Sequence, residues 1–325
     1  MKPSRPSAVL TLDGRALTAA EAALVRLRLA LSLGEAHDAA EITLAPASPL
    51  ASAAPGAQLE IALGEKDSEE TVWTGEVTDV AGTERGAVLS GLSATVALSR
   101  ERRSQTWLRQ SVADIVRDLA GPVSVDTVDA SLRLEAYSVD DRRPVWDHLV
   151  ALARLAGCDL SSAASGGLRF VPSRSAFGPL PLPLPGGDPL RYGANVLAWH
   201  VTSRTPLRAA NAVALGAASE QGAERWHWLR NEPAPDAGQG TEVRVLAALR
   251  TRDAAQAVTQ ALSARAGRSA VRGEVTAVGR PAVRPGDQVE VEDLPTPAGL
   301  LRVLAVEHRF DGGAGFVTRL SVEGV

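Results

Sequence analysis

The sequence predicts an α+β protein in which β-strands predominate. Short apolar runs separated by turn-forming residues extend along most of the chain, and two segments near its middle instead repeat their apolar residues at helical spacing. A meander of strands and glycine-rich turns closes the sequence. The 325 residues are enough for about two domains of roughly 100–200 residues each. We therefore expect two β-rich regions with an α+β segment inserted between them.

The first β-rich region is expected over residues 1–99, as a small barrel or sandwich. Thr18 and Glu21 have capping-box spacing, which would begin a helix, whereas the alternating apolar residues from Val25 to Leu33 would share one face of a strand. We favour the strand, because a helix would scatter those side chains around its circumference. Further strands, separated by glycines, are expected at residues 41–44, 58–63, 71–80 and 87–98.

The inserted α+β segment is expected over residues 100–176 and should contain two helices. Ser111 is a favourable N-cap, and the apolar residues after it recur at helical spacing until Gly121. Pro144 marks the first turn of the second helix, and Gly157 follows its last apolar residue. Strands are expected on either side of this helix, at residues 131–139 and 167–171.

A proline-rich connector and the second β-rich region complete the chain. Alternate prolines in residues 177–190 forbid a helix and favour an extended backbone. The second β-rich region is expected over residues 191–325, with one alanine-rich helix at about residues 251–266 and a turn-rich loop at residues 231–240. Its strands are expected at residues 195–203, 211–216, 288–292, 299–310 and 316–322.

The closing meander is the most informative part of the sequence. Turn residues at positions 284–287 and 311–315 separate β-branched runs, as in antiparallel strands joined by tight turns. In the last run the side chains at alternate positions from Phe316 to Val322 fall on one face, which is typical of a half-buried strand. Nothing in this block has the geometry of a catalytic loop.

Composition excludes several classes of protein. The net charge of −4 and the pI near 5.8 give no bulk basic field for nucleic acid or an anionic membrane. A single cysteine, Cys158, excludes an internal disulfide and a cysteine-rich zinc site, and it favours folding in a reducing compartment. We predict neither a signal peptide nor a membrane-spanning segment, because charged residues interrupt every long apolar run.

The sequence predicts no catalytic, cofactor or metal site. The histidines lack the spacing of a helical zinc motif, and no Gly-x-Ser-x-Gly elbow, Walker loop or dinucleotide fingerprint occurs. We expect His308 and His148 to have structural roles. Adjacent acids such as Asp140 and Asp141 would point to opposite faces of a strand, so a solvated face is a better interpretation than a glycosidase pair. The protein is therefore not expected to be an enzyme.

Two clusters that combine arginine with tryptophan are candidate interfaces. The first consists of Arg100, Arg102, Arg103, Trp107 and Arg109, and the second of Arg225, Trp226 and Trp228. For the first cluster we favour ion pairing across a subunit boundary over contact with nucleic acid, because arginine is preferred at interfaces. For the second cluster, an interface anchor and a strand that buries its tryptophan in its own core remain equally open.

Three blocks of sequence carry a resemblance to a known family. The blocks are residues 98–103 with 111–120, residues 143–158 with 168–172, and residues 284–291 with 299–308 and 315–320. In this order they resemble the baseplate hub proteins of contractile tails, namely the phage late control gene D family and the hub half of type VI spike proteins. Together they cover the chain nearly from end to end.

The resemblance implies a homotrimer in which each protomer contributes two tube-like β-barrel domains. Three chains would then present six similar domains to a hexameric tail tube and threefold symmetry to a spike. The implied partners are the tail tube protein, a central spike protein and baseplate wedge components, with no membrane, no cofactor and nucleic acid at most in transit. Assembly is expected in the bacterial cytoplasm, into a phage tail or an injection particle.

Two questions remain, namely where the spike comes from and what kind of particle the protein belongs to. The chain stops at Val325 with neither an oligonucleotide-binding-type barrel nor a β-helix after the hub region, so we expect the spike to be a separate polypeptide. The kind of particle and its cargo stay open. The alternative functions are a tail-tip cell-wall hydrolase and a freestanding carbohydrate- or peptide-binding β-protein.

Overall fold

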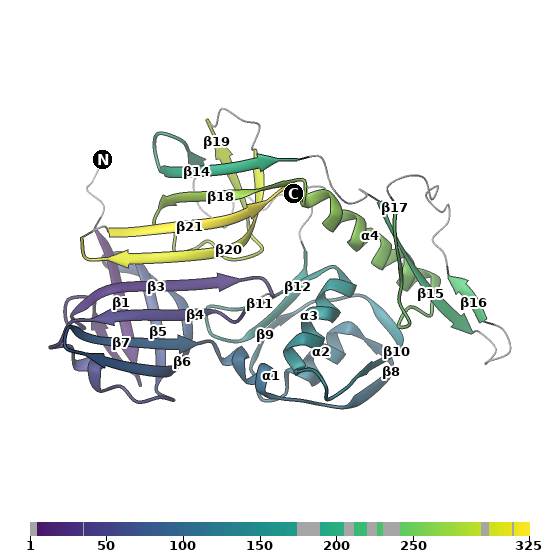
Figure 1. The fold of residues 1–325 in the computed structure, drawn as a ribbon, viewed down its shortest axis with the longest axis horizontal. Coiled ribbons are helices and arrows are strands. Elements are labelled where there is room, and N and C mark those ends of the chain that lie inside the picture. The colour runs from purple at the N-terminus through teal and green to yellow at the C-terminus, as the bar shows by residue number, and fades with distance from the viewer. Residues whose placement is uncertain are drawn as a thin grey trace.

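The computed structural model describes residues 5–34, 36–173, 189–204, 211–219, 226–229, 241–293, 299–313 and 315–325, with residues 211–219, 226–229, 241–245 and Arg252 described by their backbone alone. Strands predominate, helices are few, and most strands belong to one large antiparallel sheet, which confirms the predicted mostly-β, α+β class (Figure 1). The predicted loop at residues 231–240 and most of the predicted connector lie outside the described residues.

The N-terminal module contains seven strands. They are β1 (Pro6–Leu12), β2 (Arg15–Thr18), β3 (Leu24–Ser32), β4 (Ala39–Leu44), β5 (Gln58–Glu65), β6 (Ser68–Thr83) and β7 (Gly86–Leu92), with a short 3-10 helix at Pro49–Ser52. The C-terminal module contains β13 (Leu190–Arg191), β14 (Val196–Ser203), β18 (Val271–Val278), β19 (Gln288–Glu292), β20 (Leu300–Asp311) and β21 (Gly315–Glu323). The predicted closing meander is therefore confirmed.

Both modules use the same strand order. Along the chain, β3, β4, β5, β6 and β7 correspond to β14, β18, β19, β20 and β21, and within the sheet the two sets lie in the orders β3-β4-β7-β6-β5 and β14-β18-β21-β20-β19. In each module the long strand shifts register where its pairing with the last strand of the set ends. The shift lies between Val77 and Asp79 in β6, which pairs with β5, and between Val303 and Ala305 in β20, which pairs with β19. One strand arrangement thus occurs twice in the chain.

The two modules are joined into a single sheet of 13 strands. The second half of β20 pairs antiparallel with β3, from Ala305 opposite Ser32 to Asp311 opposite Arg26. Among the described residues the pairings follow an open path from β14 to β2, so closure of either module into the expected barrel is not seen. A strand edge can pair with one neighbour only. The edge of β3 that could have closed its own module is paired with β20 of the other module.

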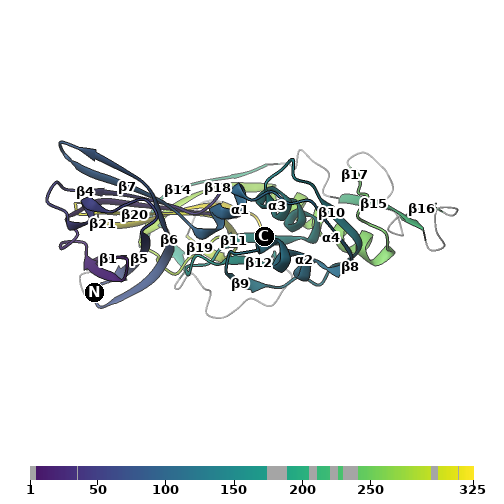
Figure 2. The same ribbon diagram turned by 90° about the horizontal axis from the view of Figure 1, so that it is seen from below.

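The sheet curls so that its strands form two layers around one apolar core. Eight strands make up what we call the front layer, in the order β14-β18-β21-β20-β3-β4-β7-β6, and β1 and β5 lie behind it (Figures 1 and 2). Buried side chains of both modules belong to one hydrophobic cluster, which includes Leu27, Ile42, Leu59, Val306 and Leu320. The shared core makes the two modules one packed unit.

Strand β3 confirms the choice of strand over helix for residues 18–33. Leu27, Leu29 and Leu31 alternate along β3 and are buried. The capping-box contacts between Thr18 and Glu21 do form, but in a turn before the strand. Val25 remains 46 % exposed, because a β-bulge next to it takes it out of the alternation.

The expectation of a strand over residues 87–98 was wrong in its second half. Strand β7 ends at Leu92, and a 3-10 turn (Ala94–Val96) and the short helix α1 (Ala97–Arg100) follow. The buried hydroxyls of Ser93 and Thr95 lie 2.8 Å apart, and both also contact Ser162 at 3.1 Å. Hydroxyl groups with partners of this kind compete with a ladder of backbone hydrogen bonds, which explains the end of the strand.

The inserted segment contains both predicted helices. They are α2 (Val112–Ala120), which Ser111 caps through its side chain, and α3 (Val145–Ala156), which ends at Gly157 in the left-handed conformation. The strands of this segment are β8 (Gln105–Ser111), β9 (Val125–Val128), β10 (Arg133–Val139), β11 (Cys158–Ser162) and β12 (Leu168–Pro172). The helices bury their apolar faces in a second hydrophobic cluster.

Helix α4 (Arg252–Arg268) confirms the third predicted helix, capped by the Thr251 side chain. Its residues Ala254, Ala255 and Val258 belong to the hydrophobic cluster of the inserted segment. A small sheet of β15 (Asn211–Ser219), β16 (Trp226–Leu229) and β17 (Thr241–Val245) lies beside α4, away from the front layer (Figures 1 and 2). In the described part of the chain, no helix is long and apolar enough to cross a membrane.

Candidate assembly surfaces

The solvent-facing side of the front layer carries charged side chains that pair across neighbouring strands. Arg28 of β3 contacts Glu307 of β20 at 2.6 Å, and Arg309 contacts the same carboxylate at 2.5 Å. Arg319 of β21 pairs with Glu274 of β18. This face is therefore polar, but the charges of these residues are largely balanced within it.

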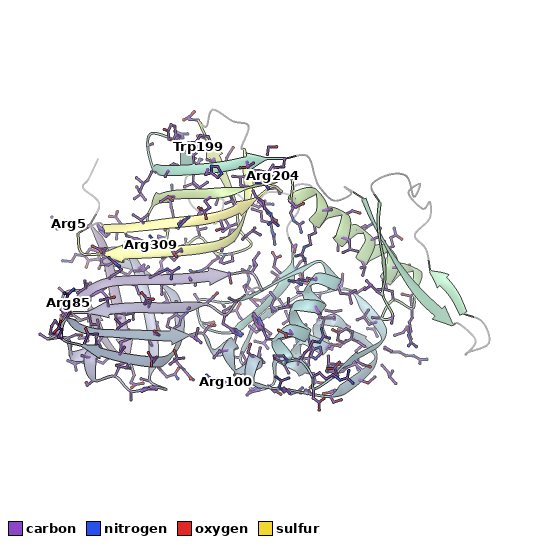
Figure 3. The ribbon with its side chains drawn as sticks, viewed as in Figure 1. Arg5, Arg85, Arg100, Trp199, Arg204 and Arg309 are labelled. Atoms are coloured by element: carbon purple, nitrogen blue, oxygen red, sulfur yellow. The ribbon has the colours of Figure 1, made fainter. Side chains whose placement is uncertain are left out.

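A shallow depression of about 300 Å³ lies on this face, beside strand β14. It is lined by Ala198, Trp199, His200, Glu274, Thr276, Glu307, Arg309, Val317 and Arg319. Trp199 and Arg309 are labelled in Figure 3, on β14 and β20. Because its charged groups already pair with one another, the depression offers no convergent set of free polar groups for a small ligand.

A buried ionic cluster fixes the inserted segment to the C-terminal module. Arg302 of β20 is 3 % exposed and donates to Glu323 of β21 and to Asp159 of β11. Arg268 of α4 approaches Glu323 at 3.3 Å, and the Ser173 hydroxyl donates to Asp159 at 2.5 Å. Three separate parts of the chain thus meet at one set of buried charges, which can be stable only while every member stays paired.

Arg284 links the two modules through a partly buried contact. Its Nη2 donates to the backbone carbonyl of Thr71 at 3.0 Å. Close by, the carboxyl of Asp38 accepts a hydrogen bond from the Ser32 backbone N–H at 3.0 Å. Burial raises the pKa of Asp38 to about 7, against the opposing effects of the Ser32 N–H and of Arg284. This carboxyl therefore titrates near neutral pH.

The histidines lie in structural positions. His308 is fully buried, with Nδ1 3.0 Å from the Thr318 hydroxyl, and burial together with Arg284 lowers its pKa to about 3. The His148 side chain is also buried, and its Nε2 contacts the Asp140 carbonyl at 2.8 Å. Among the described residues no group of three or more His, Cys, Asp or Glu side chains is placed to hold a metal ion.

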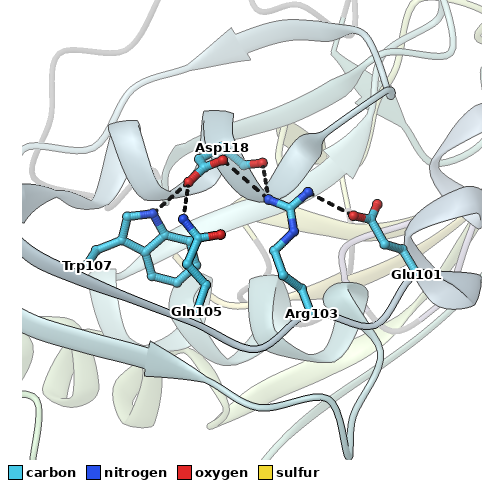
Figure 4. A network of polar contacts seen from close by, with 5 residues as sticks. All are labelled: Glu101, Arg103, Gln105, Trp107 and Asp118. Atoms are coloured by element: carbon cyan, nitrogen blue, oxygen red, sulfur yellow. Dashed lines mark hydrogen bonds and ion pairs between the residues drawn. The ribbon is translucent and has the colours of Figure 1, made fainter.

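Two of the five members of the first predicted arginine–tryptophan cluster, Arg103 and Trp107, form a polar network inside the chain. Arg103 donates to the Asp118 carbonyl at 2.8 Å and to the Glu101 carboxylate at 2.8 Å (Figure 4). The Trp107 indole N–H and the Gln105 amide each donate to Asp118 Oδ2 at 2.7 Å. Asp118 of α2 therefore organises this network, a role that its sequence position alone did not indicate.

The other members of that cluster are more accessible. Arg102 is exposed, although its guanidinium donates to the carbonyls of Asp141 and Arg142. Arg100 is exposed at the end of α1 (Figure 3). The side chain of Arg109 is 83 % exposed and lies 3.5 Å from Glu135, and Leu108 beside it is 67 % exposed. The structure thus separates the cluster into a paired part and an open part.

The second predicted cluster is described only in part. Trp226 and Trp228 lie in β16, at the edge of the small three-stranded sheet, opposite Ser219 and Ala217 of β15. Arg225 lies outside the described residues. An interface role for these residues stays a prediction.

The chain is similar in structure to proteins of phage tails and of a type VI secretion system. No family model matches the sequence, and no curated protein matches it. A tail protein from Neisseria meningitidis MC58 has a TM-score of 0.72 at 15 % identity, with 98 % of this chain and 96 % of that chain covered. The 43 kDa tail protein of prophage MuSo2 from Shewanella oneidensis has a TM-score of 0.67 at 17 % identity, and 98 % of each chain is covered. The chain shares the fold of these tail proteins.

A third similar structure widens this comparison. The Escherichia coli c3393 protein, a component of the type VI secretion system with similarity to the T4 tail proteins gp27 and gp5, has a TM-score of 0.58 at 10 % identity. The match covers 93 % of this chain and 73 % of that protein. The shared fold therefore occurs both in phage tails and in a secretion machine.

Proposed function

We propose that the protein is a structural baseplate hub of a contractile phage tail or of a phage-derived contractile injection system. In this role three copies form a ring that joins the tail tube to a separate central spike. The observation that carries the proposal is the duplicated strand order, β3-β4-β7-β6-β5 and β14-β18-β21-β20-β19, within one chain. A trimer of such chains contains six modules of one kind.

The duplication explains how a threefold ring can meet a sixfold tube. A closed ring must present one equivalent surface to each subunit of the ring it contacts. A chain with two similar modules supplies two such surfaces, so three chains supply six. The same ring keeps threefold symmetry wherever the two modules differ, which suits contact with a trimeric spike.

The structural similarities support the same role. The two tail proteins match this chain over nearly their whole length, so the likeness concerns the complete arrangement of modules and inserted segment. The similarity to a type VI secretion component agrees with a part that phage tails and injection particles have in common. The partners that we propose are the tail tube protein, the spike and baseplate wedge components, with assembly in the bacterial cytoplasm.

The proposed role is mechanical rather than catalytic. The inserted segment is fixed to the sheet by the ionic cluster of Arg302, Asp159 and Glu323, and the modules are fixed to each other by the β3–β20 pairing and by Arg284. A body held together in this way transmits force between partners without internal hinges. Exposed arginines such as Arg100 and Arg109 are candidate contacts to those partners.

Mass photometry of the full-length chain tests the proposal. We expect a species of three times the chain mass of 33.9 kDa, which forms a ring with pseudo-sixfold features in electron micrographs. Incubation with its proposed partner, a tail tube protein, should extend this ring into a short tube. A monodisperse monomer that binds carbohydrate or peptide would favour the freestanding binding protein, and cleavage of peptidoglycan would favour the hydrolase.

A further inference from the structure

Two strand edges of the front layer remain open among the described residues. The one strand that pairs with β14 is β18, and apart from an isolated bridge between Val196 and Tyr192 its outer edge is open in the described part of the chain. Strand β6 pairs with β5 up to Glu76, and the Val77 backbone bonds to Ala57 and Gly56, whereas residues 79–83 pair with β7 alone. One open edge therefore lies at each end of the front layer, and unpaired edges of this kind tend to pair with other strands.

The junction between the modules shows how such edges fit together. Beyond its register shift, β20 pairs with β3, with Ala305 opposite Ser32 and Glu307 opposite Ala30. In the repeated strand order β6 corresponds to β20, and β14 corresponds to β3. The contact of β6 with a β14 strand would thus repeat a junction that the chain already makes once within itself.

Details of the two modules agree with this correspondence. The first strand of each repeated set has a β-bulge near its start, at Val25 in β3 and at Leu197 in β14. Both bulged residues are large exposed hydrophobics, at 46 % and 57 % exposure. When the bulges of β3 and β14 are aligned, Arg204 takes the position of Ser32. When the register shifts of β6 and β20 are aligned, Asp79 takes the position of Ala305.

The direction of the strands also permits the contact. Every neighbouring pair in the front layer is antiparallel. An even number of alternating strands leaves the two end strands, β14 and β6, running in opposite directions. Rotation about an axis roughly along the strands keeps these directions, so β6 of one copy meets β14 of the next copy antiparallel, as β20 meets β3.

Charge favours the same partner. Residues 1–99 contain seven Lys and Arg against thirteen Asp and Glu, whereas the segments that carry the C-terminal module, 190–204 and 271–325, contain eight of each. A contact between the N-terminal module of one copy and the C-terminal module of another therefore brings an acidic module against a neutral one, whereas two N-terminal modules would repel each other. Locally, exposed Asp79 comes from the acidic module, and exposed Arg204, labelled in Figure 3, directly follows β14.

We propose that β6 of one copy pairs antiparallel with β14 of a second copy, in the register that β20 and β3 use within the chain. Asp79 then lies opposite Arg204 and forms an ion pair with it, and Ala81 lies opposite Thr202. This inference rests on the proposed trimer and names the surface that closes it. A heterologous contact of this kind, repeated three times, joins the front layers into one ring.

Paired cysteines test the register. In a Cys158→Ser background, Ala81→Cys and Thr202→Cys are combined in the full chain, because directly opposed residues bring their Cβ atoms within reach of a disulfide. Mild oxidation should convert most of the protein to covalent dimer and trimer on a denaturing gel, whereas each single cysteine should give neither. The matched control combines Val80→Cys with Thr202→Cys, because neighbouring residues of a strand point to opposite faces and should not link.

Charge exchange provides a second test that needs no oxidation. Asp79→Arg and Arg204→Asp should each weaken trimer formation about tenfold, and the double exchange should restore most of it. If trimers form normally but neither the cysteine pair nor the charge pair acts as stated, the edge contact is wrong and the proposed function stands. If the unmodified chain forms no trimer, the proposed function itself fails.

Discussion

The two modules share a strand order, yet they differ at the corner where the long strand bends. In the C-terminal module the opposed pair at this corner is Arg302 and Glu323, both buried. In the N-terminal module the opposed pair at the corresponding position is Glu76 and Leu92, with Glu76 exposed. The inserted segment contacts both corners, through Asp159 at the first and, at the second, through Ser162, which donates to Ser93 directly after Leu92. One backbone frame therefore meets the inserted segment through buried charges at one corner and through neutral hydroxyls at the other.

The glycines of the N-terminal module show a second difference. The Trp73 ring packs over Gly75 and Gly91, and a Cβ on either glycine would meet that ring. At the position of Gly91 the C-terminal module has Val322, which is buried in the same hydrophobic cluster. The modules thus fill equivalent space differently, one with a large ring over glycines and the other with aliphatic side chains.

Of the substitutions that test the difference between the two modules, Arg302→Ala should have the largest effect on the free energy of unfolding. Arg302→Ala leaves Asp159 and Glu323 buried without their main partner, so we expect a loss of about 3–5 kcal/mol in the free energy of unfolding. Urea unfolding of the full chain measures the loss. Arg319→Ala is the matched control, because its pair with Glu274 is exposed and should contribute less than about 1 kcal/mol. Similar losses for both variants would contradict a special role for the corner.

Asp38 should make stability depend on pH. Its pKa is about 7 in the folded protein and 3.8 ordinarily, so the folded state binds the proton more tightly than the unfolded state. The contribution of this group is complete below about pH 4 and is lost as the pH rises through 7, by up to about 4 kcal/mol at roughly 1.4 kcal/mol for each pH unit. Asp38→Asn should therefore flatten the decline in the urea midpoint between pH 5 and 8.

The control for the pH experiment is Glu84→Gln, which replaces an exposed carboxyl in the turn between β6 and β7. This variant should follow the unmodified protein across the whole pH range. Protein concentration is kept constant, since assembly would add its own stabilisation. An Asp38→Asn curve that stays parallel to the unmodified curve would show that Asp38 does not titrate near neutrality.

Gly91→Ala should test the difference in packing. The added Cβ would lie 2.9 Å from the Trp73 ring and 3.0 Å from the Glu76 carbonyl, so the ring or the strand must move. We expect a loss of about 1–3 kcal/mol in the free energy of unfolding, as in other overpacked cores. Gly82→Ala provides the control, because nothing lies within 4 Å of a Cβ at that position. An unchanged unfolding midpoint for Gly91→Ala would mean that the ring can shift without cost.

Elements specified by neighbouring residues could be predicted from the sequence. The caps at Ser111 and Gly157 and the meander ending at Val322 depend on turn chemistry and alternation within a few positions. The pairing of β3 with β20 could not be predicted, because partners such as Arg28 and Glu307 are separated by 279 residues. No local pattern marks which edges will meet.

The candidate site shows the same division. The sequence brought out Arg103 and Trp107 as one cluster, and the structure places both on Asp118. The ionic cluster around Arg302 was missed, because its members come from three distant segments and each looks like an ordinary surface charge. The signal that could have indicated burial is the position of Arg302 within the otherwise apolar run from Leu300 to Val306.

The smallest expected effects separate the two parts of the arginine–tryptophan cluster. Trp107→Phe removes only the indole N–H bond to Asp118, so it should cost about 1 kcal/mol of unfolding free energy and leave assembly unchanged. Arg109→Ala should leave unfolding unchanged, because the side chain is 83 % exposed. If Arg109 contacts a partner, the same change should slow the binding of tube or wedge components, with a larger difference at low salt. Stability loss in Arg109→Ala, or loss of partner binding in Trp107→Phe, would reverse the assignment of paired and open parts.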